Sequence, residues 1–166
     1  GPQLWVRWAL ARNVGHRADL QGTGAELARH LVERSGLRGV TVERAPPMQD
    51  HYDGRSRTIR LSPPHFDGRS VAAAAVAAHG FGHALRRAEK CVGIGAAAAA
   101  AGTQWSTLRV EIDASFNRAL PILSEEGYLA PDDRQAARQV LIACAGTYVA
   151  GALASLLRCG RGPMRA

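Results

Sequence analysis

Aromatic residues and lysine are scarce in this sequence, and both shortages limit what the protein can bind. Aromatic residues make up 5% of the 166 positions, so there is no platform of alternating aromatic and basic side chains for single-stranded nucleic acid. Lys90 is the only lysine, and the net charge of +7 comes from scattered arginines, which favours an ordinary solvated surface. We therefore expect no nucleic-acid partner, while an anionic membrane surface stays possible.

Cysteine is also scarce, and its spacing excludes the common cysteine-based sites. Cys91, Cys144 and Cys159 match neither a zinc knuckle nor a redox pair. An odd number without local pairing favours a reducing compartment, and Cys144 is predicted to be a buried, unreactive thiol. The chain shows no signal peptide, and Gly1-Pro2 resembles the remnant of a cleaved expression tag.

Long hydrophobic runs are missing apart from one borderline case. Residues 140–157 form 18 uncharged positions, at the lower limit for a membrane span. Their alanine, glycine and threonine content favours a buried core helix over a membrane-embedded one. Residues 3–20 are predicted to form a short amphipathic helix, in which Trp5 and Trp8 either anchor at a membrane interface or pack on the domain.

Alanine dominates the apolar content, and it predicts a core built mainly of helices. Hydrophobic residues make up 46% of the chain, which suits a single domain over residues 1–166. The N-terminal half is expected to supply one helix and a small, mainly antiparallel sheet. A capping box at Thr23 and Glu26 begins the helix. Alternating residues predict a strand at 39–45 and a hairpin over 49–63.

The second half is expected to be mostly helical, which makes the fold class α+β. Ser70 is predicted to cap a helix over residues 71–89. A further helix is expected over residues 105–120, where Pro121 disturbs it. Pro131 stands at the first-turn position of a last long helix.

The most informative stretch is "HGFGH" at residues 79–83, inside the first of these C-terminal helices. Two histidines four residues apart lie on one face of a helix, so His79 and His83 can reach a single metal ion. Downstream, Glu111 or Asp113 can supply a third ligand from the next helix and leave one position open for water. Alone, the histidine pair is a weak signal, because alanine-rich helices carry such pairs by chance.

Five blocks in order resemble the YugP-like family of bacterial zinc metallopeptidases, over most of residues 22–157. They are "TGAELARHLVERSGLRGVTVER", "DHYDGRSRTIRLS", "GRSVAAAAVAAHGFGHAL", "VEIDASFNRAL" and "TYVAGALASLL". The resemblance implies a zincin-like fold of the gluzincin kind, with an active-site helix and a glutamate-bearing helix. It implies zinc held by His79, His83 and Glu111, with Asp113 as a supporting acid rather than a ligand.

Two departures from the family pattern affect the expected function. The long hydrophobic insertion usual in the family is replaced by a short, weakly apolar interval over residues 89–108, which suggests a trimmed protein that is cytoplasmic or peripherally membrane-associated. Gly80 stands where the family has its general base, a glutamate that takes a proton from the metal-bound water.

Gly80 leaves three interpretations. One is a zinc peptidase inactivated by a substitution at this position, and another is a pseudo-peptidase that only binds a partner. We favour a zinc-dependent enzyme whose metal acts as a Lewis acid on a peptide or small substrate in a cleft. Protons would then be moved by another group, for which the candidates are His51, Tyr52, Asp113 and Tyr148. The resemblance implies an edge strand beside the cleft for the pair at 51 and 52, and a structural turn contact is an equally good interpretation of His51. The remaining histidines, His16, His30 and His65, are predicted to be surface or capping residues.

Overall fold

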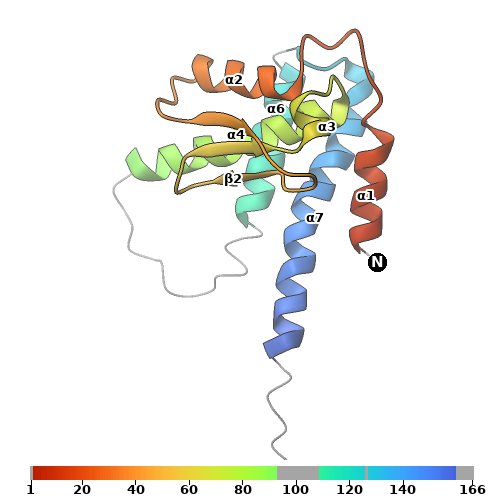
Figure 1. Ribbon diagram of the computed structural model, residues 1–166, viewed down its shortest axis with the longest axis vertical. Helices are drawn as coiled ribbons and strands as arrows, with labels where there is room; N and C mark the ends of the chain where they lie inside the picture. The colour runs from red at the N-terminus through yellow and green to blue at the C-terminus, as the bar shows by residue number, and fades with distance from the viewer. Residues whose placement is uncertain (1, 93–108, 126, 160–166) are drawn as a thin grey trace, which may run out of the picture.

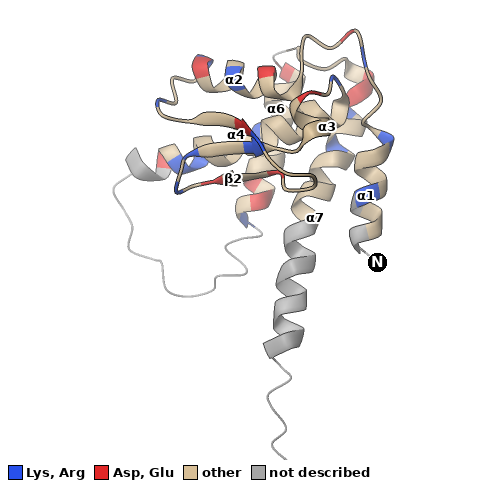
Figure 2. Ribbon diagram, viewed as in Figure 1, with Lys and Arg blue, Asp and Glu red and all other residues tan. Residues whose placement is uncertain are grey.

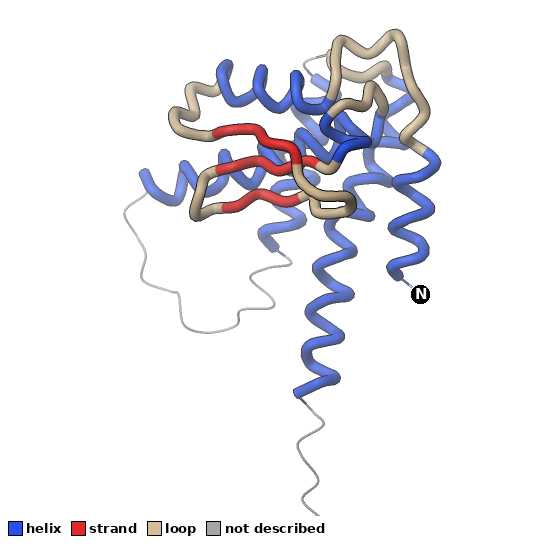
Figure 3. Tube along the Cα trace, in the orientation of Figure 1, coloured by secondary structure: helices blue, strands red, loops and turns tan. Residues whose placement is uncertain are grey.

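The computed structural model describes residues 2–92, 109–125 and 127–159, and it confirms the α+β class. Helices outnumber strands, and a small sheet lies on one side of the central helix (Figures 1 and 3). The elements run in the order α1 (Pro2–Arg12), α2 (Gly24–Arg34), β1 (Thr41–Arg44), β2 (His51–Asp53), β3 (Thr58–Leu61), α3 (Pro63–Phe66), α4 (Val71–Val92), the π-helix η1 (Asp113–Ala119), α6 (Leu120–Glu125), the 3-10 turn η2 (Pro131–Asp133) and α7 (Arg134–Cys159).

The three strands form a mixed sheet in the order β1-β3-β2. The predicted hairpin is confirmed, because β2 pairs antiparallel with β3, and Asp53 accepts hydrogen bonds from Arg55 N and Ser56 Oγ in the turn. The expectation of a mainly antiparallel sheet is wrong, because β1 pairs in parallel with β3 over four residues on its other side. An alternating pattern predicts that a strand exists, but it does not reveal the direction of its neighbour.

Helix α4 is the centre of the fold, and its alanines explain how so many elements pack on it. It contacts α2, α3, α7, η1, α6 and the sheet. Its first turns are buried on every side, as expected for a helix surrounded by others. The predicted cap is confirmed, since Ser70 Oγ accepts a hydrogen bond from Ala73 N at 3.0 Å. The capping box of α2 is confirmed as well, with both reciprocal bonds between Thr23 and Glu26 present.

The helix expected to end near Leu120 instead continues to Glu125, through a π-helical segment. Leu120 N donates to Ser115 O, five residues back, immediately before Pro121. In a regular α-helix the Pro121 ring would clash with the carbonyl four residues back. The wider π turn allows the chain to accommodate this proline and to continue as α6. The expected start of this helix at residue 105 lies outside the described residues.

Helix α1 packs along the first half of α7 (Figure 1). It is shorter than the expected amphipathic segment, and Ala9 is buried against α7 while Trp5 and Trp8 are 43% and 49% exposed. In α7, Val140 and Leu141 are fully buried, which confirms a core helix for this part of the run. The side chains of residues 147–159, Tyr148 among them, lie outside the described part. Within the described residues, no helix is both long enough and apolar enough to cross a bilayer.

Candidate metal centre

The structure brings the two histidines of α4 and Glu111 together into one compact cluster. His79 Nε2 and His83 Nε2 lie 3.1 Å apart, and each lies 3.3 Å from Glu111 Oε2. All three residues are at least largely buried, with Glu111 only 2% exposed. Asp113, the other downstream carboxylate, is not part of this cluster, so the structure selects Glu111 as the third member.

The spacing of these three atoms fits a tetrahedral zinc ion. Zinc bonds to histidine nitrogen and carboxylate oxygen measure about 2.0–2.2 Å, and neighbouring ligand atoms around a tetrahedral ion then lie roughly 3.3–3.6 Å apart. The observed separations of 3.1, 3.3 and 3.3 Å are close to this range. Glu111 Oε2 is also the only buried side-chain polar atom in the described part of the chain without a hydrogen-bond partner. A bound cation would supply the partner that this buried oxygen lacks.

The π-helical segment orients the first histidine. Ser115 Oγ lies 3.0 Å from His79 Nδ1, so this contact fixes the ring and turns Nε2 toward Glu111. Glu111 and Ser115 are four residues apart, so both face α4 and hold the ring from two sides. Gly82 permits this approach: a β-carbon there would stand 2.7 Å from Ala114 O. The sequence pattern gave no sign of the Ser115 contact.

Burial and neighbouring groups shift the pKa values of the cluster in the direction that metal binding requires. Burial lowers the pKa of His79, so the ring is held neutral with a lone pair available. Burial alone would raise the pKa of Glu111, but the two facing imidazoles outweigh it and lower that pKa to about 2. Glu111 is therefore a carboxylate at neutral pH, as a zinc ligand must be.

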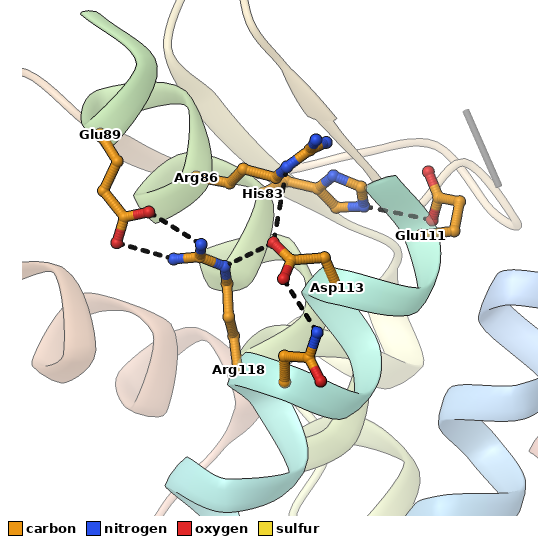
Figure 4. A network of polar contacts seen from close by, with 7 residues as sticks. His83, Arg86, Glu89, Glu111, Asp113 and Arg118 are labelled. Carbon is orange, nitrogen blue, oxygen red and sulfur yellow. Dashed lines mark hydrogen bonds and ion pairs between the residues drawn. The ribbon is translucent and has the colours of Figure 1, made fainter. Parts of the chain in front are cut away.

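Asp113 belongs to a separate ion-pair network that joins η1 to α4 (Figure 4). It accepts hydrogen bonds from Arg118 Nε at 2.8 Å and Asn117 Nδ2 at 3.1 Å, and Arg86 Nε lies 3.5 Å away. Arg118 also forms a bidentate pair with Glu89 at 2.8 and 2.9 Å. The hydrogen bond from Arg118 lowers the pKa of Asp113, so this carboxylate is a poor proton acceptor. Both of its carboxylate oxygens are therefore engaged by this network.

A cleft of about 440 Å³ opens beside the cluster, and His79, Gly80 and His83 form part of its wall. Its lining is mainly apolar. His51 and Tyr52 line the cleft from β2, which is an edge strand, as the sequence predicts. His51 Nδ1 lies 2.7 Å from Gln49 O, so this nitrogen carries the proton and donates to the carbonyl, while Nε2 offers a lone pair.

Gly80 is closely covered by the sheet. A β-carbon at this position would stand 2.9 Å from Ile59 Cγ2, and Ile59 is fully buried on β3. Any side chain at residue 80 therefore requires Ile59 to shift. The space that a side chain at this position would need is partly occupied by a core methyl group.

A second buried polar cluster in the cleft lining was missed by the sequence reasoning, which predicted His65 to be a surface or capping residue. His65 is 5% exposed, and its Nδ1 lies 2.9 Å from Asp50 Oδ2 and 3.1 Å from Ser62 Oγ. Asp50 also accepts hydrogen bonds from Ser62 N at 2.7 Å and Ser62 Oγ at 2.8 Å. Burial opposes the charge on Asp50, but hydrogen bonds from His65 and Ser62 keep its pKa below the usual value.

Cys144 lines the cleft from α7 and is only partly buried, less than the sequence predicts. Burial raises the pKa of its thiol to about 12, and the negative charges of Asp50 and Glu111 add to this shift. Such a thiol stays protonated at neutral pH, so it supplies neither a thiolate nucleophile nor a metal ligand. The rest of the surface carries charges of both signs: Figure 2 shows basic and acidic residues interspersed along α2 and the sheet.

An α+β fold with a buried His, His, Glu cluster in a cleft defines a candidate zinc metalloprotein, and comparison with known proteins identifies its family. A family model described as "putative neutral zinc metallopeptidase" matches residues 1–92 and 90–162. The chain is 32% identical over 198 aligned positions to the "Putative membrane protease YugP" of Bacillus subtilis strain 168, covering 94% of this chain and 88% of that protein. The chain belongs to this YugP-like zinc metallopeptidase family. No solved structure matches it.

Proposed function

We propose that the protein is a zinc-dependent enzyme of zincin-like architecture, in which His79, His83 and Glu111 hold the ion. The observation that carries this proposal is the triangle of ligand atoms 3.1–3.3 Å on a side, in which the buried Glu111 Oε2 has no hydrogen-bond partner in the described part of the chain. A zinc ion bound here supplies Lewis acidity, which polarises a carbonyl and acidifies water. The expected substrate is a peptide or small molecule whose reacting carbonyl enters the cleft.

The protein's own groups would bind and orient this substrate. The mainly apolar wall excludes water from much of the substrate and strengthens the polar contacts at the reacting end. The edge strand β2 is placed to pair with an extended peptide, since an edge strand presents unpaired backbone groups. Small substrates would instead be held by side chains alone.

Gly80 has no side chain to transfer a proton, so another residue of the cleft must do so. Of the candidates, Asp113 is held between two arginines, and the side chain of Tyr148 lies outside the described part. His51 is the best-supported candidate. Its Nδ1 contacts Gln49 O, so Nε2 is the nitrogen left to act as a base on the cleft wall. Tyr52 lies next to it on the same strand and stays a second candidate.

The contact between Gly80 and Ile59 favours an altered enzyme over a peptidase inactivated by one substitution. In a chain that had lost only a glutamate, the neighbouring residues would still leave room for a side chain. Here the Ile59 methyl group lies 2.9 Å from the β-carbon position. A glutamate at residue 80 would therefore require Ile59 to shift before it could act as the base.

Hydrolysis of 4-nitrophenyl acetate, a small activated ester, tests the proposal. The zinc-loaded protein should hydrolyse it, and the rate should fall to background after chelation and in His79→Ala. Return of the rate when zinc is added back to the wild type, but not to the variant, would confirm the metal dependence. Equal rates in all samples would contradict the proposed enzyme and leave a binding module as the better interpretation.

A further inference from the structure

The contacts of His65 determine which of its ring nitrogens faces a ligand. Asp50 uses Oδ1 to accept from Ser62 N, and Oδ2 to accept from Ser62 Oγ and from His65 Nδ1. The Nδ1 atom therefore carries the proton. In the neutral ring the other nitrogen, Nε2, has a lone pair, and no residue in the described part of the chain hydrogen-bonds to it. Because His65 lines the cleft, this lone pair is a hydrogen-bond acceptor offered to whatever the cleft holds.

His65 and the two histidines of the metal cluster line the same cleft. The apolar side chains of Leu61 and Val76 belong to the same lining.

We propose that the Asp50–His65 pair is a substrate-recognition site, which accepts a hydrogen bond from a hydroxyl or N–H group of the substrate. This inference deepens the function proposed above and rests on it. The substrate class it names has a reacting carbonyl, an apolar body, and a hydroxyl or N–H group that reaches His65. In this account His65 determines specificity, and Asp50 positions the His65 ring.

Straight-chain hydroxamic acids of increasing length test the proposal by binding rather than by turnover. The hydroxamate group binds zinc, and a terminal hydroxyl group at the other end of the compound tests for a hydrogen bond to His65. Each length, with and without the hydroxyl, is titrated calorimetrically into the zinc-loaded protein. At the chain length that lets the hydroxyl reach His65, the hydroxyl should tighten binding about two- to tenfold, which is the contribution of one neutral hydrogen bond.

The matched variant is His65→Asn, whose side-chain amide can still donate to Asp50 but has no atom at the Nε2 position. In this variant the gain from the hydroxyl should disappear, while the plain hydroxamates bind as they do to the wild type. If the hydroxyl gives no gain at any length, or the same gain in His65→Asn, the recognition site is refuted and the zinc site stands. If no hydroxamate binds the zinc-loaded wild type, the proposed function fails, and the recognition site fails with it.

The tautomer of His65 gives a second test that needs no metal. Nitrogen-15 NMR of the metal-free protein should show His65 protonated at Nδ1. In Asp50→Asn the amide oxygen must still accept from Ser62 N, so the amide NH₂ faces the ring, and the proton should move to Nε2. Protonation of wild-type His65 at Nε2 would refute the proposal whatever the hydroxamates do, because the acceptor would then be absent.

Discussion

Three glycines in helices allow the packing around the metal centre to be tested by one series of Gly→Ala substitutions. In an open helix interior this change stabilises a protein by about 1 kcal/mol. Gly146 of α7 is the open control, because no atom in the described part of the chain lies within 4 Å of its β-carbon position. Gly80 has Ile59 Cγ2 at 2.9 Å, and Gly82 has Ala114 O at 2.7 Å with two more backbone atoms at 3.2 and 3.3 Å.

The contacts predict a definite order of stability. Gly146→Ala should gain about 1 kcal/mol in the free energy of unfolding. For Gly80→Ala that gain is offset by overpacking against a buried methyl group, which costs about 1–3 kcal/mol, so the net change should lie between neutral and a loss of about 2 kcal/mol. Gly82→Ala should be the least stable of the three, because backbone of the π-helix has to move, whereas at Gly80 a side chain does.

Urea unfolding of the metal-free proteins measures these differences, provided the slope with denaturant stays constant. Ile59→Leu removes the Cγ2 branch at nearly constant volume, so in the double variant it should restore roughly 0.5–1 kcal/mol of the loss at Gly80. If Gly80→Ala stabilises the protein as much as Gly146→Ala, and Ile59→Leu shows no coupling, the account of a filled space beside Gly80 is wrong.

Two further predictions concern the cleft and the ion-pair network. His51→Gln should lower kcat for 4-nitrophenyl acetate by about 10²-fold without changing the zinc content, if Nε2 of this residue transfers the proton; an unchanged kcat would exclude it. Arg118→Gln should lower the free energy of unfolding by about 1 kcal/mol at neutral pH, a modest loss because the pair with Glu89 is partly exposed. The Arg118 hydrogen bonds lower the pKa of Glu89 below its ordinary value of 4.5 and the pKa of Asp113 below its ordinary value of 3.8. The stabilisation from these ion pairs is therefore present above those pH values and is lost as the pH falls below them. Urea unfolding at a series of pH values should therefore show the difference from wild type shrinking in acid, and a constant difference would contradict the assignment.

The features set by local sequence were predictable. The capping box at Thr23 and Glu26, the cap at Ser70 and the hairpin turn at Asp53 each depend on residues a few positions apart, and all three are present. The histidine pair depends only on helix periodicity. Its meeting with Glu111 was implied by the family resemblance, since spacing alone left Asp113 as an equal candidate.

The features set by tertiary packing were not predictable. Whether β1 runs parallel or antiparallel to its neighbour depends on which strand it pairs with. The residue pattern of β1 does not specify that partner. Pro121 indicates a disturbed helix, but whether the helix ends or widens into a π turn depends on its packing against α4. His65 lies 15 positions from Asp50, and the two meet because the β2–β3 hairpin brings Asp50 beside Ser62, just before α3.

Elemental analysis of the purified protein for zinc tests the central claim most directly, with His79→Ala prepared alongside. The account predicts close to one zinc ion per chain in the wild type and its loss in the variant, because the substitution removes one corner of the ligand triangle and the Ser115 contact together. No zinc in the wild type after incubation with excess metal, or equal zinc in both proteins, would contradict the assignment of His79, His83 and Glu111 as a metal centre.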